Sequence, residues 1–218
     1  VLPTSHRITQ SMAHLVSVVF ETNILAASES AEHEPSVETH SVSKWRIGPF
    51  IHDVLKRCDN CSVSLLSATK AFNAPLLMAL NHMSSRGIPL YVHGVDSSAE
   101  VGVRKGKLRV SSWHASKGTE SDIAIVLVPA SPQKNPLYVA MTRAKRRLIL
   151  IFQSEDVMPQ FVARGIVSFQ KEFPSRLVAC KTTLRNAQTA IAEAHCDTTA
   201  ETTSTLAQND SSTRPDDH

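Results

Sequence analysis

The hydrophobic residues of this chain follow two spacings, one typical of helices and one typical of strands. From Ile8 onward, apolar residues recur every three or four positions as far as Val19, which predicts an amphipathic helix with one buried face. Residues 123–128 form a continuous apolar run between Asp122 and Pro129. Such a run is typical of a strand that is covered on both faces.

Further segments continue this alternation. The other expected helices span residues 49–57, 73–87, 136–144 and 157–164, and the other expected strands span residues 62–67, 88–92 and 148–152. Within residues 101–110, Lys105 and Gly106 indicate the turn of a small basic hairpin. Strands that alternate with helices predict an α/β domain with a mainly parallel sheet.

Two segments lack a regular pattern. Residues 26–43 are polar, rich in Glu and Ser, and contain Pro35, so we expect a surface excursion there. Residues 186–218 hold almost no large apolar side chain, so burial cannot offset the entropy of ordering them. We therefore expect one domain over residues 1–170 and a weakly structured to disordered tail over residues 171–218.

The composition narrows the class of protein. A chain of 218 residues with 42% hydrophobic content suffices for one domain with a packed core. The formal net charge is only +3, so a nucleic-acid surface would need local clusters of Lys and Arg. No apolar run approaches the roughly 20 residues of a membrane-spanning helix, and the N-terminus does not resemble a secretory signal. We expect a soluble, intracellular protein with no membrane partner.

Four cysteines raise the alternative of a zinc-stabilised interaction protein. Cys58 and Cys61 form a C-x-x-C pair in a short turn, whereas Cys180 and Cys196 lie far downstream without a second such spacing. A structural zinc site needs four ligands that converge. We therefore expect reduced, structurally neutral thiols and no metal.

A more informative pattern lies at residues 136–150, with the sequence PLYVAMTRAKRRLIL. Here an expected helix presents Arg143 near its end, directly before an apolar β run. A guanidinium so placed can form a fork of hydrogen bonds to a phosphate that is bound on a neighbouring domain. The alternative interpretation is an ordinary basic helix end beside a strand.

A second pattern lies at residues 111–128, with the sequence SSWHASKGTESDIAIVLV. Gly118 allows a close backbone approach at this point. The loop before the buried strand can also present His114, Ser116 and Lys117 to a phosphate backbone. The alternative interpretation is a loop without a ligand.

These two segments resemble motifs VI and V of UvrD/Rep-type superfamily 1 DNA helicases, F-Y-V-A-x-T-R-A-K-x-x-L-x-L and H-x-x-K-G-L-E. Thr119 replaces the usual Leu of motif V. Residues 2–9, LPTSHRIT, resemble the L-x-x-N-Y-R-S-T segment that enters the second motor domain of this family, with Arg7 at the arginine. Residues 63–83 resemble the segment V-L-x-R-T-N-x-x-S-R without its arginines, and Thr69 remains there as a candidate contact.

The resemblance implies a C-terminal RecA-like motor domain, with a mainly parallel sheet flanked by helices. It implies that Arg143 and Arg7 act as catalytic arginine fingers on ATP, and that Gly118 and Glu120 join them in binding the nucleotide. The residues expected to contact single-stranded DNA are Thr69, His114, Ser116 and Lys117.

The sequence G-x-x-x-x-G-K-S/T, whose backbone N–H groups cradle phosphates in this family, does not occur in the chain. The resemblance therefore implies that ATP and Mg²⁺ are held mainly by an N-terminal RecA-like domain of the same parent protein, and that this chain is inactive alone. The first residue, Val1, fits a piece of something longer. The alternative is a truncated, catalytically inactive helicase relic that binds nucleic acid or protein.

Overall fold

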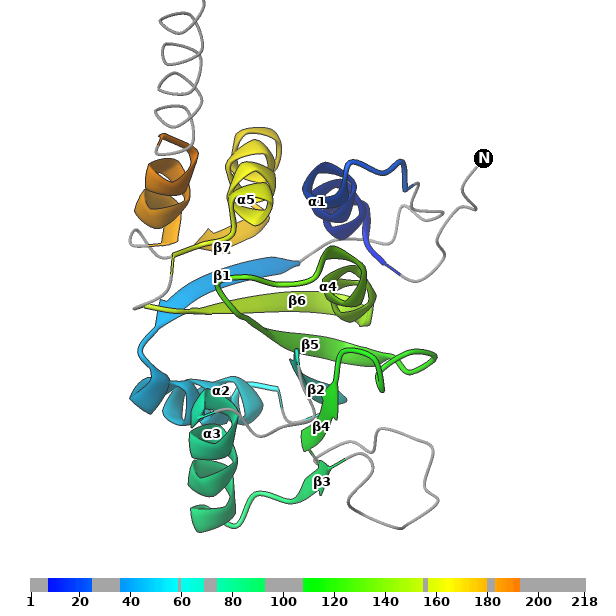
Figure 1. The fold of residues 1–218 in the computed structure, drawn as a ribbon. Helices are drawn as coiled ribbons and strands as arrows, with labels where there is room; N and C mark the ends of the chain where they lie inside the picture. Colours follow the sequence, from blue (N-terminus) through cyan, green and yellow to red (C-terminus); the bar gives the residue numbers. More distant parts are fainter. Residues whose placement is uncertain are drawn as a thin grey trace, which may run out of the picture.

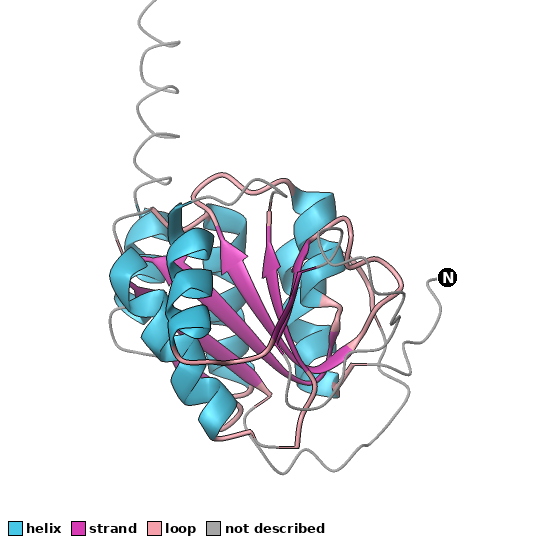
Figure 2. Ribbon diagram, turned by 90° about the horizontal axis from the view of Figure 1, so that it is seen from below, coloured by secondary structure: helices cyan, strands magenta, loops and turns pink. Residues whose placement is uncertain are grey.

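The computed structural model describes residues 8–24, 36–58, 60–68, 74–92, 108–154, 157–179 and 183–192. Within these ranges the chain forms a seven-stranded sheet with helices on both faces (Figures 1 and 2). All the strand pairs of this sheet are parallel. The predicted α/β fold with a parallel sheet flanked by helices is confirmed.

Most elements fall where the hydrophobic pattern places them. The helices are α1 (Gln10–Phe20), α2 (Ile47–Lys56), α3 (Ala74–Ser85), α4 (Lys134–Met141) and α5 (Gln160–Glu172), with a 3-10 turn η1 (Lys44–Arg46) before α2 and a further helix over residues 183–192. The strands are β1 (Val37–Val42), β2 (Val63–Ser67), β3 (Leu90–Val92), β4 (Leu108–Ser112), β5 (Ser121–Val128), β6 (Ala144–Gln153) and β7 (Leu177–Ala179). Their order in the sheet is β3-β4-β2-β5-β6-β1-β7.

The central strands are apolar throughout because their side chains alternate between two cores. In β6, Leu148 and Leu150 pack with α1, α4 and α5, whereas Ile149 and Ile151 pack with α2 and α3. Strand β5 alternates in the same way. Figure 1 shows the two helical layers on opposite sides of the sheet. The continuous apolar run at residues 123–128 is thus explained by burial on both faces.

The predicted surface excursion over residues 26–43 is wrong for its last part. Residues Val37–Val42 form an inner strand that pairs with β6 on one side and β7 on the other. The pattern is misleading because this strand carries Glu38 and His40 where an inner strand normally carries apolar side chains. Glu38 contacts both His40 and Arg147, and these contacts offset the cost of burying its carboxylate.

The predicted hairpin over residues 101–110 is contradicted by the pairing of β4. Residues 108–110 pair in parallel with β3 and with β2, so no antiparallel strand can lie beside them. Arg109 is only 6% exposed and therefore does not lie on a solvated turn. Lys105 and Gly106 lie outside the described residues.

The ordered fold continues beyond the predicted domain limit at residue 170. Strand β7 pairs with β1, and Ala187 and Ala190 of the helix over residues 183–192 lie in the same core as α5. The buried apolar positions of this helix are alanines, and its two large apolar residues, Leu184 and Ile191, are only partly buried, so its hydrophobic pattern is weak. Residues 193–218 of the predicted tail lie outside the described residues. None of the helices in the described ranges is long and apolar enough to cross a membrane.

Candidate functional site

The loop over residues 113–120 joins β4 to β5, two strands that are separated in the sheet by β2. Trp113 anchors the start of the loop, because its side chain is 1% exposed and packs in the core with α1 and α4. The Ser116 N–H donates to the Ser112 carbonyl at 3.0 Å, and the Thr119 hydroxyl donates to the Ser116 carbonyl at 2.8 Å. These bonds hold the loop in a compact series of turns.

His114 and Lys117 are both exposed on this loop, so a ligand can reach their side chains. Gly118 follows with a φ of 83°, in the left-handed region that residues with a Cβ rarely adopt. A Cβ placed on Gly118 would meet no atom within 4 Å, so the glycine is required by backbone conformation and not by crowding. The loop therefore presents one cationic and one imidazole side chain beside an open stretch of backbone.

Ser116 does not share this exposure. It is 0% exposed, and its hydroxyl donates to the Trp113 carbonyl at 2.6 Å. In this arrangement the Ser116 side chain stabilises the turn and cannot reach a phosphate. The expected contact between Ser116 and DNA is therefore withdrawn.

Arg143 lies where α4 ends and β6 is about to begin. Its guanidinium is half-buried and donates hydrogen bonds from Nε to the Val139 carbonyl at 2.9 Å, from Nη2 to the Thr142 hydroxyl at 3.1 Å, and from Nη1 to the Thr119 carbonyl at 3.3 Å. The first two bonds fix the side chain against its own helix end. The third connects it to the loop over residues 113–120.

Two further contacts join the same segments. The Ser121 N–H donates to the Arg143 carbonyl at 3.1 Å, and the Lys145 ammonium lies 3.0 Å from a carboxylate oxygen of Glu120. The side chains of Lys145 and Glu120 are 49% and 24% exposed, so this ion pair contributes little to stability. Its importance is positional, because it keeps Glu120 beside the helix end that carries Arg143.

Asp122 secures the start of β5 below this junction. Its carboxylate accepts hydrogen bonds from the backbone N–H and the hydroxyl of Ser62, both at 2.8 Å. Burial alone would raise the pKa of Asp122, but these hydrogen bonds and the charges of Arg146 and Lys145 lower it below its ordinary value. The carboxylate is therefore held ionised and ties β5 to the start of β2.

The structure thus brings together Gly118, Glu120 and Arg143 among the residues selected from the sequence. Arg7 and Thr69, the other two positions taken from the resemblance, lie outside the described residues. No group of three or more His, Cys, Asp or Glu side chains within the described ranges could hold a metal ion. Cys58 and Cys61 are free thiols, and burial raises the pKa of Cys58.

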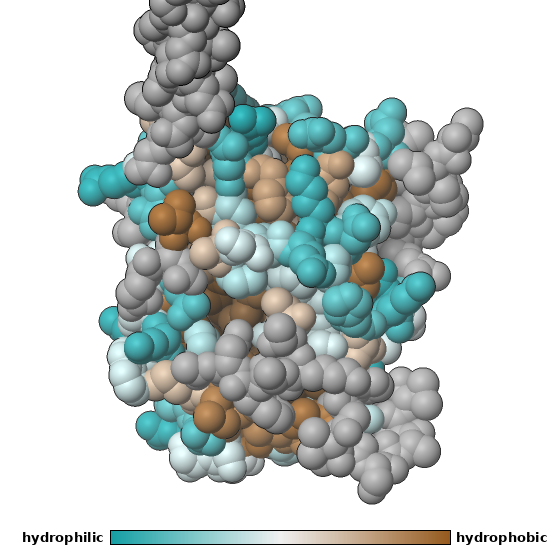
Figure 3. All heavy atoms as spheres, in the orientation of Figure 1, coloured by the Kyte–Doolittle hydropathy of each residue, from teal (hydrophilic) through white to brown (hydrophobic). Residues whose placement is uncertain are grey.

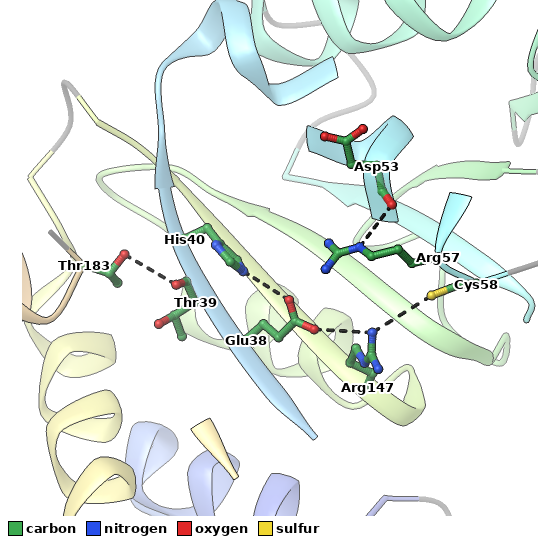
Figure 4. Close-up of polar contacts among 8 residues, drawn as sticks. All are labelled: Glu38, Thr39, His40, Asp53, Arg57, Cys58, Arg147 and Thr183. Carbon is green, nitrogen blue, oxygen red and sulfur yellow. Dashed lines mark hydrogen bonds and ion pairs between the residues drawn. The ribbon is translucent and has the colours of Figure 1, made fainter. Parts of the chain in front are cut away.

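The sequence analysis missed a polar cluster on β1 and β6 (Figure 4). One carboxylate oxygen of Glu38 lies 3.1 Å from His40 Nε2, and the other lies 3.4 Å from Arg147 Nη1, which also approaches the Cys58 sulfur at 4.0 Å. Burial alone would raise the pKa of Glu38, but the hydrogen bond from His40 and the charge of Arg147 lower it. Only the strand pairing brings these residues together, since Arg147 is distant in sequence.

Comparison with known proteins agrees with the resemblance. Residues 107–151 match the sequence model of the UvrD-like helicase C-terminal domain, and this range contains β4, the loop over residues 113–120, β5 and α4. The recognition of this helicase domain from the sequence is confirmed. Curated proteins give no match to the chain.

Solved structures agree on the fold. The C-terminal domain of a possible DNA helicase from Lactobacillus plantarum WCFS1 is similar, with a TM-score of 0.55 and 16% identity, over 81% of this chain and 99% of that chain. The chain therefore has the RecA-like fold of a helicase C-terminal domain. An arterivirus nonstructural protein 10 helicase in complex with DNA aligns more weakly, with a TM-score of 0.44 and 14% identity, over 78% of this chain and 37% of that chain.

Proposed function

We propose that this chain is the second motor domain of an ATP-dependent DNA helicase, which completes the ATP site of a neighbouring domain and grips single-stranded DNA. The observation that carries the proposal is the junction between Arg143 and the loop that ends in Glu120. One segment offers a guanidinium and the other a carboxylate, and both lie at the same place in the fold.

The residues of this junction fit a nucleotide. Arg143 donates two hydrogen bonds to its own helix end, and its Nη1 donates to the neutral backbone carbonyl of Thr119 at 3.3 Å. A phosphate oxygen is a stronger acceptor for this guanidinium than a carbonyl, because the bond then joins two charges. The Glu120 carboxylate can accept a sugar hydroxyl, and the bare backbone at Gly118 permits close approach.

ATP and Mg²⁺ would be held mainly by a domain that carries the phosphate-binding loop, and hydrolysis would need both domains together. Arg143, with Arg7 as its expected partner, would stabilise the charge that develops on the transferred phosphoryl group. An arginine in this role accelerates hydrolysis by about 10³- to 10⁵-fold, or roughly 4 to 7 kcal/mol of barrier.

The same loop would form the grip on DNA. His114 and Lys117 are exposed at its turn and would contact the phosphate backbone, whereas Ser116 would only maintain the turn. Because Lys117 and Glu120 are three positions apart on one compact loop, a shift of the loop on nucleotide binding would also shift the grip. Alternate closing and opening of the cleft would then move the domain along the strand.

Binding of a labelled oligo-dT to the chain tests the DNA part of this proposal. The double variant His114→Ala/Lys117→Ala should bind more weakly, and its log K should depend less steeply on log salt, by about 0.7 for the lost phosphate contact of Lys117. The control Lys134→Ala/Lys171→Ala removes cations from α4 and α5 and should bind like the wild type. Equal weakening in both variants would show that only the overall charge matters, which would contradict the loop as the grip.

A further inference from the structure

Trp45 is the most exposed of the large hydrophobic side chains in the described residues, at 68%. A tryptophan normally buries most of its surface, so such exposure needs an explanation. The residue lies in the 3-10 turn η1 directly after β1, and its neighbours in sequence are Lys44 and Arg46. The Lys44 ammonium lies 5.5 Å from the centroid of the indole ring. An exposed aromatic side chain therefore has one cation near its ring and a second cationic residue next to it in sequence.

The turn that carries Trp45 is fixed in place. The Arg46 N–H donates to the Ser43 carbonyl at 2.9 Å, and η1 packs against both α2 and α3. These two helices pack closely at Gly48 of α2, where an added Cβ would lie 2.6 Å from the His82 Cβ of α3. The indole is therefore presented from a rigid support, and its exposure does not result from a loose chain end.

The layer that supports η1 is strongly basic. Over residues 44–58 and 74–92 it carries five Lys and Arg (Lys44, Arg46, Lys56, Arg57 and Arg86) and only one acidic residue (Asp53), which gives a formal charge of 5 − 1 = +4. The α2–α3 layer therefore has a local excess of positive charge.

The charges on this layer are close enough to act on one another. Partial burial lowers the pKa of His52, and the nearby charges of Lys56 and Arg86 lower it further. The layer also exposes apolar surface: Leu77 of α3 is 46% exposed, and Figure 3 shows hydrophobic residues at the lower end of the molecule, where α3 lies. Positive charge and apolar surface thus occur on the same side of the sheet.

We infer that η1 and the adjoining α2–α3 layer form a second contact surface for single-stranded nucleic acid, in which Trp45 stacks on a base and Lys44 and Arg46 contact the flanking phosphates. Surfaces that bind single strands without sequence preference combine these two features, aromatic side chains for the bases and cations for the backbone. An acidic protein segment would satisfy the cations but would leave the indole without a partner.

This surface is separate from the loop over residues 113–120 and needs no nucleotide. Both follow the carboxyl end of a parallel strand, η1 after β1 and the loop after β4, so both begin at the same edge of the sheet. Three strands, β2, β5 and β6, lie between β4 and β1. The loop then returns to the opposite edge, where Ser121 begins β5 beside Arg143. Its Trp113 packs on the α1–α4 face, whereas η1 packs against α2 and α3, so the two surfaces lie on different faces of the sheet.

The test uses the whole chain, with an unlabelled 20-residue oligo-dT for the tryptophan emission of the wild type and a labelled 20-residue oligo-dT for the affinity of each variant. Of the two tryptophans only Trp45 is exposed, since Trp113 is 1% exposed, so stacking should quench the emission of Trp45. Trp45→Ala should bind about 5- to 100-fold more weakly, while Trp45→Phe should retain most of the affinity and lose the quenching. Lys44→Gln/Arg46→Gln should lower the salt slope by about 1.4, for two single-strand phosphates.

The control Val157→Ala removes another exposed apolar side chain, 66% exposed, before α5 and should bind like the wild type. Unchanged emission at saturating oligo-dT, or wild-type affinity in Trp45→Ala, would overturn the inference. If His114→Ala/Lys117→Ala then still weakens binding, the loop remains the grip and only the second surface is lost. Displacement of oligo-dT by an equal concentration of poly-Glu peptide would also overturn it, in favour of an acidic protein partner.

Discussion

The Nη1 atom of Arg143 lies 3.3 Å from the carbonyl oxygen of Thr119, so a charged hydrogen bond links the end of α4 to the loop between β4 and β5. In the proposed mechanism the guanidinium exchanges this carbonyl for a phosphate oxygen when the ATP site closes. The loop then loses one of its attachments at the moment when the nucleotide is engaged. The bond between Arg143 and Thr119 therefore connects nucleotide binding to the position of His114 and Lys117.

Gly118→Ala should weaken both the fold and the grip on DNA. Alanine at a φ of 83° is strained, with an expected loss of about 1–2 kcal/mol in the free energy of unfolding. Since a Cβ meets no atom there, this loss is conformational and the rest of the domain stays intact. Chemical denaturation measures the loss in the free energy of unfolding, and the affinity for oligo-dT reports whether the loop is displaced.

Gly87→Ala provides the matched control. Gly87 has a φ of 67° and equally open surroundings, so it should lose a similar free energy of unfolding, but it follows α3 and lies outside the loop. Because Gly87 also lies in the α2–α3 layer, oligo-dT binding is compared in the Trp45→Ala background, where only Gly118→Ala should reduce the remaining binding. The same reduction in both variants would attribute the effect to lost stability and not to the loop.

Glu38→Gln should strongly destabilise the domain. The substitution removes the negative charge that lies 3.4 Å from Arg147, whose side chain is only 19% exposed. Breaking such a pair costs roughly 3 kcal/mol, which lowers the melting temperature of a domain of this size by about 6–12 °C. Glu172→Gln is the control, because Glu172 pairs with His14 while 58% exposed and should change stability by less than about 1 kcal/mol. If the melting temperature falls by the same amount in both variants, burial of the pair is not the cause of the destabilisation.

Acid should destabilise the fold through Asp122 and Glu38. Both carboxyls have folded-state pKa values below their ordinary values of 3.8 and 4.5, so each contributes stability above its ordinary pKa. This contribution is lost as the pH falls through the ordinary pKa toward the lower folded value. The free energy of unfolding should therefore fall from about pH 5 downward, and it should fall less steeply in Asp122→Asn. An unchanged slope in that variant would contradict the lowered pKa.

The features that the sequence predicted correctly are those that short segments encode. Alternating strands and helices, the helix end at Arg143 and the glycine turn at Gly118 each depend on residues within one stretch of chain. The resemblance to helicase motifs could be identified for the same reason. In contrast, Ser116 has a polar side chain on a loop and was expected at the surface. Its burial depends on the anchoring of Trp113 in a core formed by distant elements.

Contacts between distant segments also explain why the sequence predicted neither the strand β1 nor the exposure of Trp45. Glu38 and His40 give the inner strand β1 the polar pattern of a surface segment. Glu38 pairs with Arg147, which lies on β6. Hydrophobic pattern alone cannot reveal such a pair, because each member resembles a solvated residue. Trp45 is the opposite case, because a tryptophan is normally buried and this one is 68% exposed.

In the proposed function, Arg143 completes an ATP site on a neighbouring domain. ATP hydrolysis that is stimulated by single-stranded DNA tests this role in a protein that joins this domain to one carrying the phosphate-binding loop. Wild type is compared with Arg143→Ala and with Arg146→Ala, which removes an exposed arginine from the same segment, and circular dichroism confirms folding. We predict a loss of about 10³-fold or more in Arg143→Ala alone. Hydrolysis at the wild-type rate in Arg143→Ala would contradict the account, and no hydrolysis in any of the three proteins would favour an inactive helicase relic.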